Sequence, residues 1–478
     1  MEKEANYIVA IDMGTSNVVT LIGKKAEDGK ISIVASSCVK SNGMARGDVK
    51  NTDQIVNAVK ESLLAIEKEY GIKVCEAYVG LSGQHIKCEQ HSGYVSVTNR
   101  EGEVREDDVL RLSDDMRNIS VPPGEVIIHI LPQNYILDDD PDISHPVGMV
   151  GKRLAGVFNI ITGDKNNLAL VDRCMRRADV NIVDVILNSL ASAEAVLVDD
   201  EKELGVAVVD IGGGTCDICI YYDKTIRYLG VIPIGGNIIN KDIKSCGVLE
   251  RLVEKLKVKF GSAMSDSVPE NQVITLPSIN STPSKEISQK TLASIIEARM
   301  MDVIERLEEI IERVGYKGKL SGGIVLTGGG AQLKDLDKLF ARHLKCEVRI
   351  AVPDLYVTAD SVEKVNSPMY STAVGLLLKG AVIGRPTKTI AFKKSKPVES
   401  VYEQFAEGGI HSGQQQGYLF DQPAEDTDTV LPQVEVPHDE SQHETHERRG
   451  FGGWLKNTVG KVKGIIDPQD DELEDNNF

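Results

Sequence analysis

Two glycine-containing segments, residues 12–17 and 210–215, constrain the fold of this chain more than any other feature. Their sequences are Asp-Met-Gly-Thr-Ser-Asn and Asp-Ile-Gly-Gly-Gly-Thr. Apolar or β-rich runs typical of buried strands lie on both sides of each segment: 7–11 and 18–22 around the first, 206–209 and 216–222 around the second. The pattern predicts a strand, a tight hairpin and a second strand, used twice in one chain.

Both hairpins have the composition of a phosphate-binding site. Glycines let the backbone approach a ligand, and the N–H groups of a turn can form a concave anion site. Either hairpin alone is also an ordinary turn, so the prediction depends on the pair, which would hold a triphosphate from both sides. Asp12 and Asp210 would then hold Mg²⁺, through water, beside the phosphates. The predicted phosphate-binding residues are Asp12, Gly14, Thr15, Ser16, Asn17, Asp210, Gly212, Gly213, Gly214 and Thr215.

A third glycine run completes the set. Gly328, Gly329, Gly330 and Ala331 follow a predicted buried strand, and a helix-like stretch occupies residues 333–344. Glycines at this turn would let a flat base lie against the backbone. The alternative is an ordinary strand-to-helix turn of a doubly wound sheet.

In this order, the three motifs resemble the phosphate-1, phosphate-2 and adenosine motifs of the actin, heat-shock-chaperone and sugar-kinase superfamily. Within that superfamily the chain is similar to the FtsA family of bacterial cell division proteins over most of residues 6–384. Five further segments carry this similarity: VGLSGQHI at 79–86, HILPQ at 129–133, PVGM at 146–149, ELGV at 203–206 and LKVKFG at 256–261.

The resemblance implies an α/β, actin-like two-lobed ATPase fold (duplicated ribonuclease-H-like domains) with an inserted 1C (SHS2) subdomain. The length of 478 residues is too great for one hydrophobic core and fits several lobes. The expected divisions are a first lobe (1A) at 6–83 and 164–234, the 1C insert at 84–163, a second lobe (2A/2B) at 235–385, a disordered linker at 386–449, an amphipathic membrane-targeting helix at 450–466 and an acidic tail at 467–478.

The resemblance also implies contacts outside the three glycine motifs. Gly236, Glu254 and Lys257 are expected to bind the nucleotide, although the latter two, three residues apart on a helix, could equally form a surface ion pair. On a predicted helix at 291–314, Arg299 and Asp302 are candidate contacts for the C-terminal peptide of FtsZ, the division tubulin. The alternative is the solvated face of a surface helix.

Hydrolysis of ATP requires a group that orients or deprotonates a water. Aligned with the chaperones, Asn188 occupies the place of their glutamate. An amide holds a water weakly and cannot act as a base, and Glu194 is expected to face away from the site. We therefore expect ATP binding with at most slow hydrolysis.

Charge and cysteine content restrict the possible partners. The net charge of −18 argues against nucleic acid as a partner, because neutralising phosphates takes Lys and Arg. Cys216 and Cys219 have metal-like spacing, but in a strand they would point to opposite faces.

The sequence also indicates no targeting segment at its start and no membrane span. Residues 1–4 lead directly into the first strand, which leaves no room for a signal peptide, and no stretch approaches the roughly 20 apolar residues that span a bilayer.

The C-terminal part of the chain predicts a tethered membrane anchor. Residues 386–449 are too polar to form a core. On a helical wheel, seven apolar residues of the following segment fall within an arc of roughly 140°, with three lysines at its edges. This pattern favours an interfacial helix on anionic lipid, and the alternative is docking on the protein's own lobes. The predicted membrane contacts are Phe451, Trp454, Leu455, Val459, Val462, Ile465, Ile466, Lys456, Lys461 and Lys463.

The function implied is that of an ATP-binding, actin-like, self-assembling cell division protein. It would anchor the FtsZ ring to the cytoplasmic face of the inner membrane at the septum and help to recruit later division proteins. Two alternatives stay open. One is a PilM-type ATP-binding protein of pilus assembly, and the other, less favoured, is a sugar-kinase-like phosphotransferase.

Overall fold

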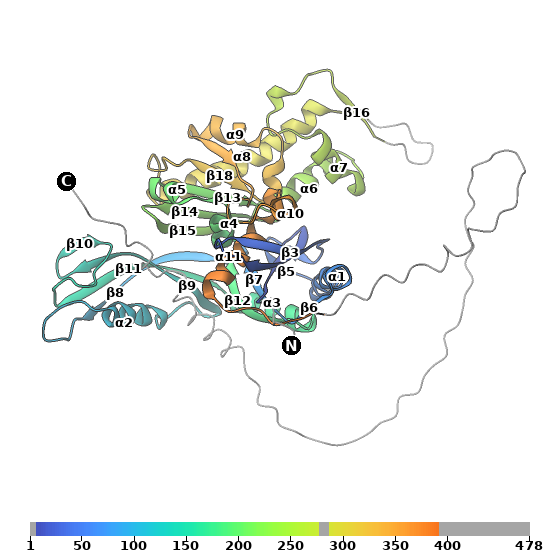
Figure 1. The fold of residues 1–478 in the computed structure, drawn as a ribbon. Helices are drawn as coiled ribbons and strands as arrows, with labels where there is room; N and C mark the ends of the chain where they lie inside the picture. The colour runs from blue at the N-terminus through green and yellow to red at the C-terminus, as the bar shows by residue number, and fades with distance from the viewer. Residues whose placement is uncertain (1–5, 277–285, 392–478) are drawn as a thin grey trace, which may run out of the picture.

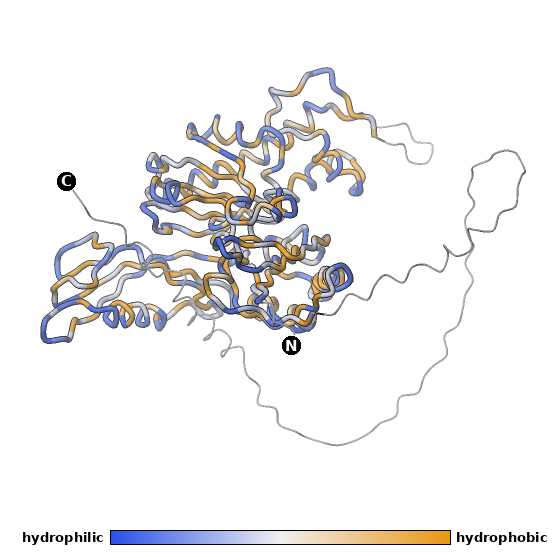
Figure 2. Tube along the Cα trace, in the orientation of Figure 1, coloured by the Kyte–Doolittle hydropathy of each residue, from blue (hydrophilic) through white to orange (hydrophobic). Residues whose placement is uncertain are grey.

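The computed structural model describes residues 6–276 and 286–391. Two lobes lie one above the other in Figure 1, and a smaller unit projects from the side of the lower lobe. The lower, first lobe contains the blue N-terminal strands, and the upper, second lobe contains green, yellow and orange segments. Hydrophobic residues gather along the strands and inner helices, whereas hydrophilic residues occupy the outer loops (Figure 2).

The first lobe is built on a five-stranded sheet in the order β12-β7-β1-β2-β3. Its first strand is antiparallel to β2 and parallel to β7. The strands are β1 (Ile8–Met13), β2 (Asn17–Lys25), β3 (Ile31–Lys40), β7 (Glu76–Leu81) and β12 (Asn181–Leu187). The remaining elements are β4 (Met44–Ala45), β5 (Asp48–Val49), α1 (Thr52–Tyr70), β6 (Ile72–Val74) and α3 (Lys165–Arg177).

The second lobe repeats this sheet with the order β15-β14-β13-β18-β19. Here β13 is antiparallel to β14 and parallel to β18, so the central hairpin and its parallel neighbour occur in both lobes. This repetition confirms the predicted strand–hairpin–strand unit, used twice. The strands are β13 (Val206–Ile211), β14 (Cys216–Tyr222), β15 (Thr225–Ile232), β18 (Ile324–Thr327) and β19 (Val348–Ile350).

Helices and short elements cover the outer face of the second sheet. The buried side chains of α8 form the apolar stripe that its 3.6-residue period predicts. The elements are α6 (Gly236–Ser245), α7 (Glu250–Phe260), η1 (Ser265–Ser267), β16 (Val273–Thr275), β17 (Glu286–Ser288), α8 (Gln289–Arg313), η2 (Gly329–Gln332) and α9 (Leu336–Leu344).

Two helices lie between the sheets and join the lobes. Almost every residue of α4 (Asn188–Val196) is buried, and α11 (Ser371–Ile383) packs directly against it. Side chains alternate across β13: Val206 and Val208 share a core with the first lobe, whereas Ala207 and Val209 pack with the outer helices of the second. The remaining short elements are α5 (Asp199–Leu204), α10 (Val362–Val365), η3 (Pro368–Tyr370) and β20 (Thr389–Ala391).

The projecting unit, which we call the insert, leaves the first lobe after β7 and returns at α3. Its antiparallel sheet has the order β10-β9-β11-β8, and one helix, α2, packs against it. Gln133 and Asn159 donate side-chain hydrogen bonds to backbone carbonyls of β15, at 2.9 and 2.7 Å, so the insert also contacts the second lobe. Its elements are β8 (Lys87–Ser96), α2 (Glu106–Arg117), β9 (Glu125–Leu137), β10 (Asp140–Ile143) and β11 (Arg153–Asp164).

Two predicted boundaries are wrong. The first lobe was expected to extend to residue 234, but β13, β14 and β15 belong to the sheet of the second lobe. Their pairing with β18, about a hundred residues later, is a tertiary contact that local sequence does not reveal. The linker was expected to begin at residue 386, but β20 pairs with β6, and the N–H of Thr387 donates to the carbonyl of Tyr7 at 2.8 Å. A three-residue strand is too short to show periodicity.

The predicted membrane-targeting helix, its lipid-binding residues, the acidic tail and the linker beyond residue 391 lie outside the described residues. Within the described part of the chain, no helix combines the length and the hydrophobicity needed to cross a bilayer.

Candidate functional site

A cavity of about 440 Å³ lies between the two lobes, and both glycine hairpins contribute to its wall. The glycine turn after β18 and the start of α6 form other parts of the wall. All the residues predicted to bind ATP line the cavity except Gly214 and Ala331. The sequence motifs, spread over more than three hundred residues, therefore meet at one place.

The two hairpins have the same closing hydrogen bond. The N–H of Gly14 donates to the carbonyl of Asn17 at 2.9 Å, and the N–H of Gly212 donates to that of Thr215 at 2.8 Å. The turns also touch one another across the cavity, because a Cβ on Gly213 would lie 2.1 Å from the Oγ of Ser16. A larger residue at position 213 would push the hairpins apart.

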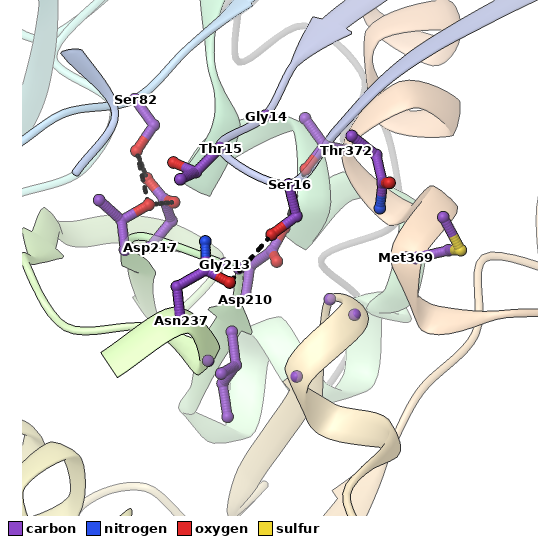
Figure 3. Close-up of a pocket in the computed structure, with 18 of the residues that line it drawn as sticks. Gly14, Thr15, Ser16, Ser82, Asp210, Gly213, Asp217, Asn237, Met369 and Thr372 are labelled. Atoms are coloured by element: carbon purple, nitrogen blue, oxygen red, sulfur yellow. Dashed lines mark hydrogen bonds between the residues drawn. The ribbon is translucent and has the colours of Figure 1, made fainter. Parts of the chain in front are cut away.

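Three carboxylates lie behind the hairpins: Asp210 and Asp217, which are buried (Figure 3), and Asp12, which is partly buried. Asp12 accepts a hydrogen bond from Asn188 Nδ2 at 3.3 Å. Asp210 accepts one from Thr372 Oγ1 at 2.9 Å and another from Ser192. The third is Asp217, opposite Asp210 in the β13–β14 register.

Asp217 connects the two lobes. It accepts hydrogen bonds from Ser82 Oγ at 2.6 Å and from Thr215 Oγ1 at 3.2 Å. Ser82 directly follows β7 of the first lobe, so this bond crosses the cavity. Ser16 makes a second, longer crossing bond, donating to Asn237 Oδ1 at 3.4 Å.

Burial and mutual repulsion raise the pKa values of these acids. Burial raises the pKa of Asp12 to about 7, with help from the charge of Asp210 and against the hydrogen bond from Asn188. The pKa of Asp217 rises to about 8, again mainly by burial and then by the charge of Asp210. Burial also raises the pKa of Asp210 itself. Such a cluster is suited to a cation that would stabilise the ionised carboxylates.

The donor set fits a hydrated magnesium ion. Mg²⁺ prefers oxygen ligands and usually keeps several waters. Across residues 6–276 and 286–391, no three His, Cys, Asp or Glu side chains are grouped closely enough to hold one ion directly. Asp12 and Asp210 would therefore act through bound water, as predicted from sequence, with Asp217 as an additional acid.

Several of these residues were missed by sequence reasoning. Ser82, Ser192 and Thr372 come from three separate elements and become neighbours of the carboxylates only in the fold. Asp217 did carry a signal, because it is the one charged residue in the apolar strand β14. Because side chains alternate along β14, Cys216 packs with the outer helices of the second lobe and Cys219 packs in the core shared with the first lobe. The two thiols thus point to opposite faces, as predicted.

The wall beside the second hairpin, where the N–H of Gly236 donates to the carbonyl of Gly212 at 2.9 Å, contains the predicted adenosine contacts. Lys257 Nζ donates to the carbonyl of Gly236 at 3.3 Å and pairs with Glu254 at 2.8 Å. Apolar side chains of Met300, Met369 and Val258 also line the cavity. This combination of a few polar groups and an apolar surface is typical of a site for a flat heterocycle.

Asn188 begins α4 at the edge of the cavity. Its Oδ1 is buried without a hydrogen-bond partner in the described structure, and a Cβ on Gly80 would lie 2.4 Å from it. The amide is therefore held in place with one acceptor unused. A water or ligand hydroxyl could occupy that acceptor.

Glu194 faces away from the cavity, as expected. Its carboxylate accepts hydrogen bonds from Lys379 Nζ at 2.8 Å and from Tyr221 at 3.1 Å, and pairs with Lys202 at 3.3 Å. Burial alone would raise the pKa of Glu194, but the two ammonium groups lower it to about 2. This acid is committed to a structural ion network and is not available as a base.

The candidate partner residues pair with each other. Arg299 Nε donates to Asp242 Oδ2 at 2.9 Å, and its Nη1 donates to Asp302 Oδ2 at 2.6 Å. The three residues thus join α8 to α6 on a partly exposed surface. A peptide that binds there would compete with these ion pairs.

Replacement of Gly328 by alanine is expected to weaken nucleotide binding. Gly328 has a φ of 83°, and an added Cβ would lie 2.1 Å from Asp210 Oδ1 and 2.7 Å from the carbonyl oxygen of Ile211. With a ψ of 166° this residue lies in a backbone region that is essentially confined to glycine, so the strain alone costs about 1–3 kcal/mol, and the clash displaces Asp210. Calorimetric titration with Mg²⁺ and ATP checks this. Gly29→Ala also places a side chain at a positive φ (81°) but with no atoms within 4 Å, and serves as the control. Equal losses in both variants would contradict the prediction.

Comparison with known proteins gives matches over most of the described chain. The family described as "Cell division protein FtsA" matches residues 207–375, and the "SHS2 domain inserted in FTSA" matches residues 83–162. The FtsA protein of Pseudomonas aeruginosa is 33% identical over 379 residues, covering 79% of this chain and 90% of the relative. That of Neisseria meningitidis is 35% identical over 379 residues, covering 79% and 91%.

Two further comparisons agree with these. The FtsA protein of Escherichia coli K12 is 33% identical over 385 residues, covering 79% of this chain and 91% of the relative. Among solved structures, a PilM–PilN type IV pilus biogenesis complex matches with a TM-score of 0.56 at 14% identity, covering 78% of this chain and 98% of the other. At that identity the likeness concerns the fold alone. The predicted two-lobed actin-like fold with an inserted SHS2 subdomain is confirmed.

Proposed function

Because the chain belongs to the FtsA family of bacterial cell division proteins, we propose that it binds ATP with Mg²⁺ between its lobes and acts as an actin-like adaptor. In this role it self-assembles and anchors the FtsZ ring to the cytoplasmic face of the inner membrane at the septum, where it helps to recruit later division proteins.

The observation that carries this proposal is the pair of matching hairpins that face each other over a cluster of three acids, two of them buried. The hairpin N–H groups and hydroxyls of Thr15, Ser16 and Thr215 would bind the phosphates. Magnesium would neutralise phosphate charge, and Asp12 and Asp210 would hold its waters. Lys257 and Glu254 would contact the ribose side, with the glycine turn after β18 against the base.

Turnover is expected to be slow, if it occurs. Asn188 is the residue at the cavity edge that could orient an attacking water, and an amide cannot accept its proton. The Ser82–Asp217 bond links the lobes beside the site, in addition to the packing of α4 and α11 between the sheets. Bound nucleotide would therefore act mainly by setting the angle between lobes, and through it the geometry of a filament.

The adaptor role combines contacts with the FtsZ peptide, with lipid and with further copies of the chain. The surface at Arg299 and Asp302 would receive the FtsZ tail peptide, and the amphipathic helix predicted at 450–466, with Trp454, would lie on anionic lipid. A helix of this size binds reversibly, and linking many copies in a filament raises its avidity by orders of magnitude. The PilM alternative is supported by likeness of fold alone.

Liposome flotation tests the proposal. The full chain is compared with a chain ending at Glu447, each with Mg²⁺, ATP and anionic vesicles. We expect the full chain alone to float, and to carry an FtsZ tail peptide with it. Flotation of both chains would place the membrane contact elsewhere. A full chain that binds neither ATP nor the peptide would contradict the adaptor function.

A further inference from the structure

Arg46 stands in an unusual backbone conformation at the edge of the cavity. It forms the tight turn between β4 and β5 together with Gly47, and both have positive φ angles, 54° and 78°. An arginine pays a steric cost in this region that glycine avoids. Such outliers persist where the surrounding structure holds them, and they gather at functional sites.

The turn is fixed on both sides by backbone contacts. A Cβ on Gly214, in the second hairpin, would lie 2.9 Å from the backbone nitrogen of Arg46. On the other side, the carbonyl of Arg46 accepts the N–H of Gln84 at 3.3 Å, and a Cβ on Gly47 would lie 2.5 Å from the Cα of Gly83. The turn thus packs between the second hairpin, at Gly214, and the start of the insert, at Gly83 and Gln84.

The backbone of Arg46 is held by its neighbours, whereas its side chain has no partner. The side chain is exposed, and it makes no hydrogen bond or ion pair with any residue of the described structure. Its neighbours Met44 and Gly47 both line the cavity. A long cationic side chain without a partner is therefore attached at the cavity rim, beside the hairpin that is proposed to hold the phosphates.

The hairpin end of the cavity carries negative charge, and a bound triphosphate would add more. This end has the buried acids Asp210 and Asp217 and the partly buried Asp12. The lysines in the wall formed by described residues are Lys257, which pairs with Glu254, and Lys334, which follows the glycine turn after β18. Lys257 also donates to the carbonyl of Gly236, so it is held by two partners, and Lys334 lies beyond the glycine turn. A magnesium ion would offset part of the negative charge of a triphosphate placed at the hairpins, and would leave the terminal phosphate without a protein cation.

We propose that Arg46 binds the terminal phosphate of the nucleotide and gives the protein its preference for ATP over ADP. The guanidinium group forms two parallel hydrogen bonds to phosphate oxygens, which suits it to this task. ADP lacks the phosphate that Arg46 reaches, so its affinity does not depend on this residue. The inference rests on the proposed nucleotide function of the cavity.

Calorimetric titration of the full chain with Mg²⁺ and either AMPPNP, a non-hydrolysable ATP analogue, or ADP tests the inference. Arg46→Asn is the main variant, because asparagine tolerates the left-handed conformation. We expect its AMPPNP affinity to fall roughly 10- to 100-fold, as for loss of charged hydrogen bonds, with ADP affinity unchanged. Arg46→Lys retains a point charge and should recover part of the loss. Lys60→Ala, on the exposed face of α1, is the matched control for removal of a positive charge.

The outcomes distinguish failure of the proposed role of Arg46 from failure of the proposed nucleotide function. If the unaltered chain binds AMPPNP and ADP but Arg46→Asn binds both as before, the inference is overturned and the proposed function stands. Equal loss for both nucleotides would also overturn it, because it would indicate a disturbed hairpin. If the unaltered chain binds neither nucleotide, the proposed function fails, and the role of Arg46 fails with it.

Discussion

Replacing Gly375 with alanine is expected to destabilise the protein by about 3 kcal/mol, the upper end for overpacking in a core. Gly375 lies in α11 where this helix crosses α4. An added Cβ would lie 1.8 Å from the carbonyl oxygen of Ala191, 2.3 Å from its carbonyl carbon and 2.8 Å from its Cα. All three atoms belong to the backbone of a buried helix, so relief requires the helices to separate.

Urea unfolding measures this loss, and a control lies in the same helix. A Cβ on Gly380 would meet side-chain atoms of Ile8 and Tyr78, at 2.7 and 2.8 Å, which can adjust more easily. Gly380→Ala should therefore cost clearly less. Gly375→Ala should also weaken nucleotide binding, since Ser192 of α4 and Thr372 of α11 both donate to Asp210. Equal unfolding midpoints for the two variants would show that the helix crossing is not as tight as the structure indicates.

The local parts of the fold could be predicted because local chemistry determines them. The limits of helix α1 follow from local signals, since Asn51 caps its N-terminus and Gly71 takes the left-handed conformation at its C-terminus. Both hairpins follow from apolar strands interrupted by Gly and Thr. These features depend on a few neighbouring residues and on hydrophobic periodicity.

The pairing of distant elements could not be predicted in the same way. Strand β13 lies beside β18, and β20 beside β6, through contacts between residues far apart in the chain. Gly375 belongs to no recognisable motif, and its importance appears only where two helices cross. In the site, the glycines were found because each motif is local. The hydroxyl groups that support the acids come from separate elements.

In metal-free protein, stability is expected to fall as pH rises from about 6.5 to 8. The pKa values of Asp12 and Asp217 in the folded state are about 7 and 8, above the ordinary value of 3.8 that applies after unfolding. The folded state therefore retains protons that the unfolded state has released. As pH rises through the folded values, ionisation of the buried acids costs the folded state about 2–3 kcal/mol.

Other groups titrate outside this pH range. The pKa of His129 falls to about 4 through burial and then through the charge of Lys379. This group therefore increases stability as pH rises from about 4 to 6.5, mainly below the pH range of the acids. The stabilising contribution of Glu194, whose pKa is about 2, is lost only in stronger acid. Thermal unfolding in the presence of a chelator, at several pH values between about 6.5 and 8, follows the ionisation of these acids, and a comparison with Asp217→Asn assigns the change to them.

Addition of Mg²⁺ should reverse this trend, because a cation favours the ionised carboxylates. We expect the rise in unfolding temperature caused by Mg²⁺ to be larger at the upper end of this pH range than at the lower end. Asp217→Asn removes one acid while keeping hydrogen-bonding capacity toward Ser82 and Thr215, and should flatten the pH dependence of the metal-free protein. If stability stays constant or increases with pH in the absence of metal, the prediction is wrong. The three carboxylates would then be more solvated, or repel one another less, than their positions between the lobes indicate.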